Sequence, residues 1–170
     1  PDDVVLVGHS QAGLVLRQVG TRLDGRLRLL AYLDAPVPAA GQRGVDLLGG
    51  PPVDAAHLPP RDTVLPPAPV VPDAAVDAEV AEWMTARLGP TPLGPSLDPV
   101  TVGPSAAPTV VAFCDRTPPG YPSVVARARF DAEGLAYDLL DAPHDAPVTD
   151  PALVADWLLG HLADRGGLDR

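Results

Sequence analysis

Short apolar runs alternate with stretches of helical periodicity along most of the chain. Val4–Val7 is a continuous, mostly β-branched apolar run, which is typical of a strand buried on both faces. Three later runs have the same character, and they cover Leu29–Leu33, Thr109–Cys114 and Leu135–Leu140. The pattern predicts four strands of one sheet.

Three stretches with helical spacing lie between or after these runs. The first runs from Gln11 to about Val19, and the second, Ser123–Glu133, ends where Gly134 can close a helix. The third begins at Pro151, with Asp150 as its N-cap. We expect its buried face to consist of Leu153, Val154, Trp157, Leu158 and Leu162. Because strands and helices alternate, the chain is predicted to have an α/β fold with a parallel sheet and right-handed crossovers.

A proline-rich segment interrupts this alternation from about Pro36 to Pro108. It holds most of the 23 prolines of the chain, so long regular elements are not expected in its first half. We therefore expect a core made of residues 1–35 and 109–170, with residues 36–108 inserted as a cap or lid. Within the insertion, Asp73 is expected to cap a helix that runs to Leu88.

Charge and composition narrow the choice of partners. The net charge is −10, and the basic residues, all arginine, do not cluster, so nucleic acid is not an expected partner. No apolar run approaches the roughly 20 residues that cross a bilayer. The single cysteine, Cys114, excludes an internal disulfide, and a cytoplasmic location is the default expectation. The oligomeric state is unknown from the sequence.

Candidate chemistry begins where the first strand meets the first helix, at Gly8-His9-Ser10-Gln11-Ala12. A nucleophile elbow holds its serine in a strained turn, and only very small residues fit two positions before and after it. Gly8 and Ala12 meet that demand, although the strict motif has glycine at both places. Ser10 is therefore predicted to be a nucleophile, with the Gln11 amide stabilising an oxyanion. A serine that only caps the helix is the alternative.

These features together resemble a known superfamily. The elbow, the segment Tyr32–Pro38 and the final Leu140–Asp145 look like an α/β-hydrolase, from the serine-esterase branch related to plant methylesterases and hydroxynitrile lyases. The resemblance covers most of the chain apart from the proline-rich insertion. It implies a partial fold whose strands are equivalent to the fifth to eighth of the usual eight. Since the chain begins at Pro1, we expect it to be N-terminally truncated.

The resemblance implies a catalytic triad of serine, histidine and an acid. His144 lies in the loop after the last strand, where this fold places the base. Two aspartates remain open as the acid. Asp115 follows Thr109–Cys114, the equivalent of the seventh strand, although the family's aspartate commonly falls two residues later, at Thr117. Asp34 is the rival, because the pancreatic-lipase branch takes its acid from the end of the preceding strand.

Three residues are candidates for the substrate pocket. His9 adjoins the serine in sequence, and Trp83 and Met84 share one face of the expected cap helix, from which they could face an acyl group. A purely structural packing role is the alternative for Trp83 and Met84. The chemistry needs no metal and no organic cofactor.

The leading hypothesis is hydrolysis of a small-molecule carboxylic ester by acyl transfer. A hydroxynitrile lyase would use the same serine and histidine, but that branch normally has a pocket lysine, and this chain has none. A non-catalytic remnant of an α/β-hydrolase is the alternative from another class.

The truncation that the resemblance implies has two expected consequences. The second oxyanion donor would come from a missing loop, and loss of one donor costs about 10²–10³ in turnover. The missing third strand would also leave Val4–Val7 as an open sheet edge, which promotes aggregation. We therefore expect the chain alone to be weakly active or poorly soluble.

Overall fold

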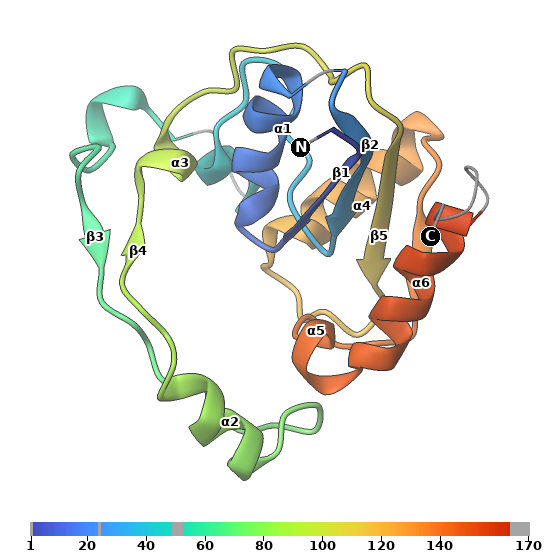
Figure 1. Ribbon diagram of the computed structural model, residues 1–170. Coiled ribbons are helices and arrows are strands. Elements are labelled where there is room, and N and C mark those ends of the chain that lie inside the picture. The colour runs from blue at the N-terminus through green and yellow to red at the C-terminus, as the bar shows by residue number, and fades with distance from the viewer. Residues whose placement is uncertain (1, 24, 49–52, 164–170) are drawn as a thin grey trace.

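A four-stranded parallel sheet forms the centre of the molecule (Figure 1). The computed structural model describes residues 2–23, 25–48 and 53–163. The strands lie in the order β1 (Val4–His9), β2 (Leu27–Leu33), β5 (Thr109–Cys114) and β6 (Asp138–Leu140), and each neighbouring pair is parallel. The predicted α/β class and parallel sheet are confirmed.

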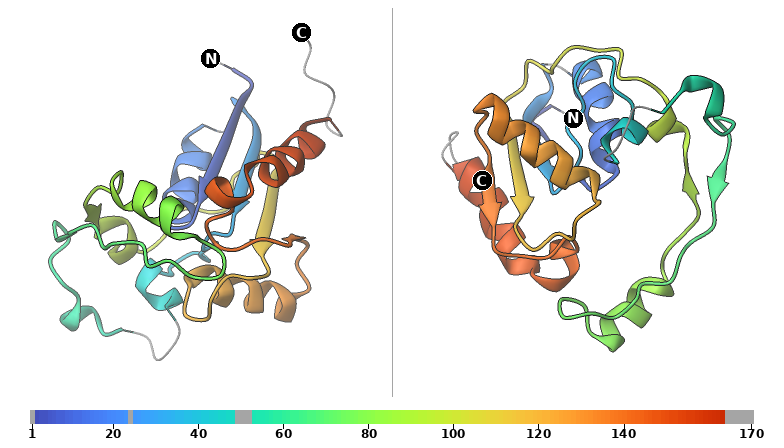
Figure 2. Two further views of the ribbon diagram at one scale, coloured as in Figure 1. Left: turned by 90° about the horizontal axis from the view of Figure 1, so that it is seen from below. Right: turned by 180° about the vertical axis from the view of Figure 1, so that it is seen from behind.

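Helices cover both faces of this sheet (Figures 1 and 2). Helices α1 (Ala12–Arg22) and α4 (Pro122–Glu133) cover one face, and α6 (Pro151–Ala163) covers the other. Successive side chains of a strand point to opposite faces of the sheet. Strand β2 therefore contributes Leu30 and Tyr32 to the core beneath α1 and α4, and Leu29 and Ala31 to the core beneath α6. In the described part of the chain, no helix combines the length and the apolar character that a membrane span requires.

Three of the differences from the expected elements concern the last strand, the cap helix and the buried face of α6. The last strand is shorter, because Gly134 ends α4 with φ 64° and the Leu135 amide still bonds the Phe130 carbonyl of that helix. The cap helix α2 (Ala78–Thr85) starts at Asp77, whose carboxylate accepts the Val80 amide. Asp73 instead caps the turn before it, through the amides of Ala75 and Val76. The third difference is in α6, where Val154 and Leu162 are buried but Leu153 is exposed.

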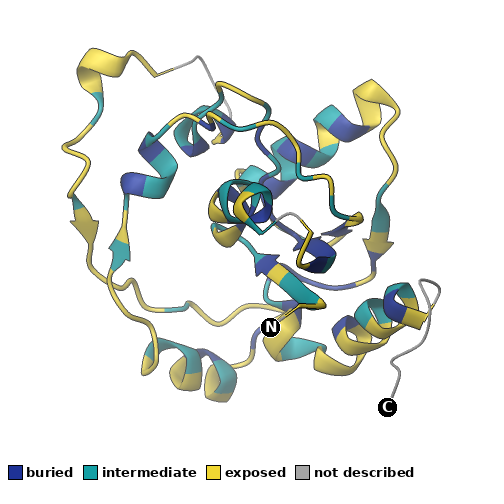
Figure 3. Ribbon diagram, turned by 45° about the horizontal axis from the view of Figure 1, so that its top comes forward, coloured by how far each residue is buried: buried dark blue, intermediate teal, exposed yellow. Residues whose placement is uncertain are grey.

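The segment between β2 and β5 forms an arm beside the sheet. Its elements are short: η1 (Gly44–Leu47), η2 (Ala55–His57), β3 (Val64–Leu65), α2, β4 (Thr91–Pro92), α3 (Gly94–Leu97). Strands β3 and β4 pair antiparallel and carry α2 away from the sheet, toward α5 (Ala146–Thr149) (Figure 1). Figure 3 shows that most of the arm around β3 and α2 is exposed, while its ends near η1 and α3 return to the core.

The junction of β1 and α1 brings two backbones unusually close together. A Cβ atom added at Gly8 would lie 3.0 Å from both terminal methyl carbons of Leu16. At Gly13 it would lie 2.3 Å from the Pro36 carbonyl oxygen, so the tightest approach falls one residue after Ala12. Ala12 itself is exposed, which explains why alanine is tolerated where the strict elbow motif has glycine.

Strand β1 lies at one end of the described sheet. Its residues are mostly half-buried and Val7 is 41% exposed, whereas β2 beside it is buried at six of seven positions. An apolar strand with one unpaired side is thus present at this edge, as the sequence predicts.

Replacing Gly13 with alanine tests the close approach at the elbow. We expect Gly13→Ala to lower the free energy of unfolding by about 3 kcal/mol or more, because the added carbon cannot avoid the Pro36 carbonyl without moving backbone. The matched control is Gly160→Ala in α6, where an added Cβ meets nothing within 4 Å. It should stabilise the protein by about 0.5–1 kcal/mol. Urea unfolding measures both, and equal effects of the two substitutions would contradict this reading.

Candidate active site

Ser10 stands at the sharp turn between β1 and α1. Its φ of 52° lies in the left-handed region, which a residue with a side chain adopts only under strain. The turn is held by the Ser10 amide on the Leu33 carbonyl (3.3 Å) and by the Gly13 amide on the Ser10 carbonyl (3.0 Å). This geometry turns the Ser10 side chain toward a cavity at the end of the sheet.

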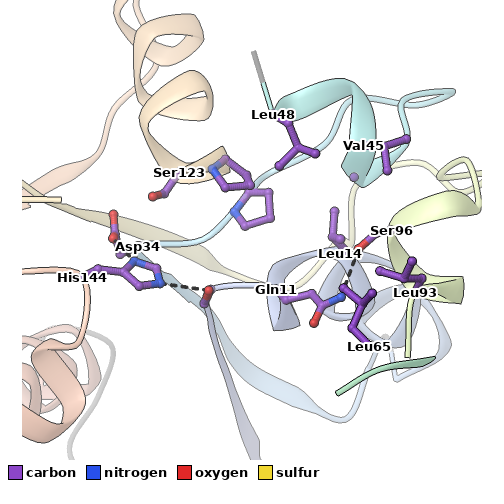
Figure 4. A pocket seen from close by; sticks show the side chains of 14 residues that line it. Gln11, Leu14, Asp34, Val45, Leu48, Leu65, Leu93, Ser96, Ser123 and His144 are labelled. Carbon is purple, nitrogen blue, oxygen red and sulfur yellow. Dashed lines mark hydrogen bonds and ion pairs between the residues drawn. The ribbon is translucent and has the colours of Figure 1, made fainter. Parts of the chain in front are cut away.

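A continuous chain of hydrogen bonds starts at the Ser10 hydroxyl (Figure 4). Ser10 Oγ lies 3.0 Å from His144 Nε2, and His144 Nδ1 lies 2.5 Å from Asp34 Oδ2. Ser10 follows β1, Asp34 follows β2, and His144 lies in the loop after β6. The carboxyl ends of parallel strands meet at one edge of the sheet, so residues far apart in sequence converge there.

The buried Asp34 carboxylate is held by three groups, one from the His144 loop and two from the end of β5. Its Oδ2 accepts the Thr117 hydroxyl at 2.6 Å besides facing His144, and its Oδ1 accepts the Cys114 amide at 3.2 Å. Burial by itself would raise the pKa of Asp34, but the hydrogen bonds from His144, Thr117 and Cys114 outweigh it and lower that pKa. Asp34, 1% exposed, is therefore held as a carboxylate.

The structure distinguishes between the two aspartates that the sequence left open as the acid. Residues 114–117 form a turn in which the Thr117 amide bonds the Cys114 carbonyl (3.5 Å). The residues at the base of this turn, Cys114 and Thr117, face Asp34, whereas Asp115 lies at its corner and is exposed. The imidazole of His144 is therefore paired with Asp34, and Asp115 is turned to solvent.

His9 lies against His144 and not in the cavity where the sequence placed it. Its Nε2 donates to the His144 carbonyl at 2.8 Å, and the two ring centroids are 4.7 Å apart. Burial and the neighbouring His144 lower the pKa of His9. Its hydrogen bond to the His144 carbonyl and the charge of Asp34 act in the opposite direction, but the net effect is a lowered pKa. A neutral His9 thus supports the backbone of the His144 loop.

The β5–α4 loop also supplies contacts that the sequence analysis missed. Thr117 bonds Asp34, and the Tyr121 ring packs on the His144 ring with centroids 4.3 Å apart. The only sequence signal was that an acid was expected in this loop. The loop instead contacts the carboxylate of Asp34, which follows the neighbouring strand β2.

Ser10 lines a cavity of about 290 Å³ (Figure 4). Its polar lining consists of Ser10, Asp34, His144, Ser123 and a pair in which Gln11 Nε2 donates to Ser96 Oγ at 3.0 Å. The rest of the lining is aliphatic or glycine: Leu14, Pro36, Gly44, Val45, Leu48, Leu65, Leu93 and Pro122. The cavity therefore joins a hydrogen-bonding end at Ser10 to an apolar end beneath the arm.

The two cap-helix candidates lie elsewhere. In the described part of the chain, the lining of this cavity includes neither Trp83 nor Met84. Trp83 is 49% exposed, stacks against the Arg87 guanidinium (4.3 Å to the ring centroid) and borders a separate hollow beside Val148 of α5. Helix α2 sits at the far end of the arm, and this is why its residues do not reach Ser10 (Figure 1).

Helix α1 begins directly after Ser10, so its N-terminus lies beside that residue. Gln11 is the N-cap of α1, so its amide precedes the helical turns and has no intrahelical acceptor. No group of three or more histidine, cysteine, aspartate or glutamate side chains placed to hold a metal ion occurs among the described residues.

Comparison with solved structures identifies the fold of the chain. No family model matches the chain. An extracellular α/β-hydrolase from a Paenibacillus species superposes with a TM-score of 0.70 at 18% identity, covering 94% of this chain and 72% of that one. A methylesterase from Arabidopsis superposes with a TM-score of 0.68 at 19% identity, covering 96% and 70%. The chain has the α/β-hydrolase fold, as the sequence predicts.

A closer similarity in sequence is confined to a short segment. A carbendazim-hydrolyzing esterase from Nocardioides sp. (strain SG-4G) is 49% identical over 47 residues. The match spans 28% of this chain and 19% of the length of that esterase.

The assignment of Asp34 as the partner of His144 can be tested against its rival. We expect Asp34→Asn to slow the labelling of Ser10 by a fluorophosphonate by about 10⁴-fold, because the imidazole loses its tautomer control and its charge partner. The control Asp115→Asn removes an equal charge at the exposed corner and should leave the labelling rate within twofold. A larger effect at Asp115 would reverse the assignment.

The depressed pKa of His9 predicts a pH dependence of stability. The unfolded chain binds a proton at His9 below its ordinary pKa of about 6.5, while the folded chain resists it. The contribution of His9 to the free energy of unfolding is therefore fully present above pH 6.5, the ordinary pKa of histidine. It is lost as the pH falls from there through the lower pKa of the folded state. His9→Gln, which keeps an amide donor, should lose less stability between pH 7.5 and pH 5 than the native chain.

Urea midpoints at several pH values measure this difference. The matched control is His57→Gln, on the exposed η2 turn, which should follow the native curve. Parallel curves for native and His9→Gln protein would show that His9 is not held neutral by the fold.

Proposed function

We propose that this chain carries the catalytic triad of a serine hydrolase that cleaves carboxylic esters by acyl transfer. The observation that carries the proposal is the hydrogen-bonded series from Ser10 through His144 to Asp34, with distances of 3.0 and 2.5 Å. A serine hydroxyl is a weak nucleophile until an adjacent base takes its proton, and this arrangement supplies that base.

In the first step, Ser10 Oγ forms a bond to the ester carbonyl carbon while its proton moves to His144 Nε2. Asp34 accepts a hydrogen bond from the Nδ1–H group of His144, which leaves Nε2 unprotonated and able to act as the base, and the carboxylate stabilises the imidazolium that forms. The Gln11 amide at the start of α1 donates to the developing oxyanion.

The tetrahedral intermediate then collapses to an acyl-enzyme. The bond from carbon to the alcohol oxygen breaks, and the leaving alcohol takes the proton from His144 Nε2. In the second half, water loses a proton to His144 and attacks the acyl carbon, and the Ser10 oxygen leaves with that proton. The carboxylic acid product is released and the triad returns to its starting state.

The cavity favours an ester with a compact aliphatic part. Its apolar end is lined by leucine, valine and proline side chains, and its volume is about 290 Å³. Apolar pockets with a few polar groups at one end orient small-molecule ligands in this way. The names of the similar proteins, an esterase and a methylesterase among them, support the same substrate class.

We further propose that residues 36–108 act as a cap on a core made of residues 1–35 and 109–170. The cap supplies much of the apolar end of the cavity, through Val45, Leu48, Leu65 and Leu93. Ser96 of α3 ties the cap to the elbow through its bond to Gln11. Substrate selection would therefore lie in the cap, and bond cleavage in the core.

Hydrolysis of p-nitrophenyl butyrate by the purified chain tests the proposal. We expect slow turnover that Ser10→Ala reduces to the background rate, because the Ser10 hydroxyl lies within hydrogen-bond distance of the proposed base, His144 Nε2. Ser105→Ala, outside the cavity lining, is the matched control and should keep native turnover. A fluorophosphonate should label the native chain and not Ser10→Ala. Folded native protein that neither turns over the ester nor takes the label would favour a non-catalytic protein.

A further inference from the structure

A second cavity lies on the face of the sheet that α1 and α4 cover. Its volume is about 330 Å³, within the range of small-molecule sites, and among the described residues its lining has none in common with the cavity around Ser10. Its walls include Arg17 of α1, Tyr32 of β2, Val111 of β5 and Arg129 of α4, and the segment that returns from the arm to β5 also contributes. The proposed mechanism gives this cavity no role.

The charged side chains that line this second cavity are both positive. Arg17 and Arg129 line it, and no aspartate or glutamate of the described part of the chain does so. The whole chain, in contrast, has 22 acidic and 12 basic residues. The two arginines are far apart in sequence and come from different helices, so only the fold brings them to one cavity. An acidic protein therefore presents a local positive charge at this place.

The Arg129 guanidinium is held mainly by uncharged oxygens. Its Nη2 donates to the Val37 carbonyl at 2.6 Å, and its Nη1 donates to Gln42 Oε1 at 3.4 Å. Its buried Nε has no hydrogen-bond acceptor in the described part of the chain, and the Glu133 carboxylate is 4.0 Å from that nitrogen. Neutral acceptors do not balance the charge of a guanidinium group, so this charge remains available to an anion.

Tyr32 places a hydroxyl near Arg17. The residue is 3% exposed, and no hydrogen bond within the described ranges uses its hydroxyl. Burial raises the pKa of Tyr32 to about 12, although the positive charge of Arg17 acts in the opposite direction. The hydroxyl is therefore protonated at neutral pH and can donate. Arg17 Nε makes only a long hydrogen bond, 3.4 Å, to the Val102 carbonyl.

The remaining walls of this cavity are mostly apolar. Leucine, valine, proline and phenylalanine side chains form them, and Leu30, Val111, Phe130 and Leu135 are examples. A bare inorganic anion would leave these walls without a contact, whereas a neutral apolar molecule would leave the arginines without one. A molecule with a negative group at one end and an apolar body would satisfy both parts of the lining.

We propose that this second cavity binds a small carboxylate with an apolar body, whose negative end contacts Arg17, Arg129 and the Tyr32 hydroxyl. Planar guanidinium groups match a carboxylate in shape as well as in charge, and hydrogen bonds to charged groups are among the stronger ones. The apolar body lies against Phe130 and the aliphatic side chains around it. The proposal does not depend on ester turnover at Ser10, because the two cavities have separate linings in the described residues.

Benzoate is a suitable probe, because it combines one carboxylate with a compact apolar ring. We expect a two-dimensional ¹H–¹⁵N NMR titration of the whole chain to show saturable shifts at the amides of Phe130, Leu135 and Ala136, with a Kd of about 1 mM or tighter. Shifts that centre on Gln11 and His144 would put benzoate in the cavity around Ser10 and would overturn the proposal. Shifts that do not saturate would also overturn it.

Two substitutions test the residues that hold the carboxylate. Tyr32→Phe removes one hydroxyl that the described chain leaves unbonded, so the protein should stay folded while the Kd for benzoate rises about tenfold. Arg17→Gln should raise the Kd by about tenfold or more. Arg127→Gln on α4 is the matched control, because it removes an equal charge outside the lining, and its Kd should stay within twofold of native. Equal affinity in all four folded proteins would refute the assignment of these residues.

Two further ligands test the chemical class. Benzamide has the same size and no charge, and it should bind at least tenfold more weakly than benzoate if the arginines recognise a carboxylate. Inorganic phosphate has the charge without the apolar body, and it should also bind more weakly. Benzamide or phosphate that binds as tightly as benzoate would contradict the proposed class. Since every readout is binding, these results are separate from the outcome of the ester assay.

Discussion

The buried pairing of Asp34 with His144 is the interaction on which the rest of the site depends. A carboxylate that is 1% exposed is tolerated only when its oxygens accept enough hydrogen bonds to offset the loss of water. Here those bonds come from the imidazole and from the end of β5, which lies beside β2 in the sheet. The parallel register therefore serves the chemistry directly, because it brings the ends of neighbouring strands into contact. With the carboxylate fixed, the imidazole is oriented, and its far nitrogen meets the Ser10 hydroxyl.

Much of this arrangement could be predicted from the sequence. Short apolar runs separated by helical stretches predicted the parallel sheet and its covering helices, and the small residues around Ser10 predicted the tight elbow. His144 was singled out because it follows the last strand. These features depend on local pattern and chain order, which a single sequence contains. The sequence analysis did not single out Gly13, where an added Cβ would lie 2.3 Å from the Pro36 carbonyl oxygen and 2.8 Å from Ala35 Cβ.

The acid and the pocket depended on information that the sequence does not contain. Asp115 and Asp34 both follow buried strands, and only the turn at residues 114–117 decides that one faces the imidazole and the other faces solvent. Trp83 and Met84 were expected to share one face of the cap helix and to face the pocket. The paired strands β3 and β4 instead hold that helix away from the elbow. In both cases the path of the backbone, and not the type of residue, determines whether a side chain reaches the site. Thr117 was noted only as a departure from the family pattern, although it contacts the acid directly.

The two walls of the cavity come from parts of the chain that are built very differently. The wall that contains Ser10 is constrained by close contact between backbone segments, because a Cβ added at Gly13 would clash with the Pro36 carbonyl oxygen. The opposite wall comes from short elements of the arm, and two of its leucines, Leu48 and Leu65, are exposed. A substitution at Leu65, which is 46% exposed, is expected to cost little in folding, whereas Gly13 at the elbow cannot take an added carbon without movement of the backbone. With the function proposed above, a lineage with this architecture would change which molecules it accepts through the arm while inheriting the Ser10 elbow unchanged.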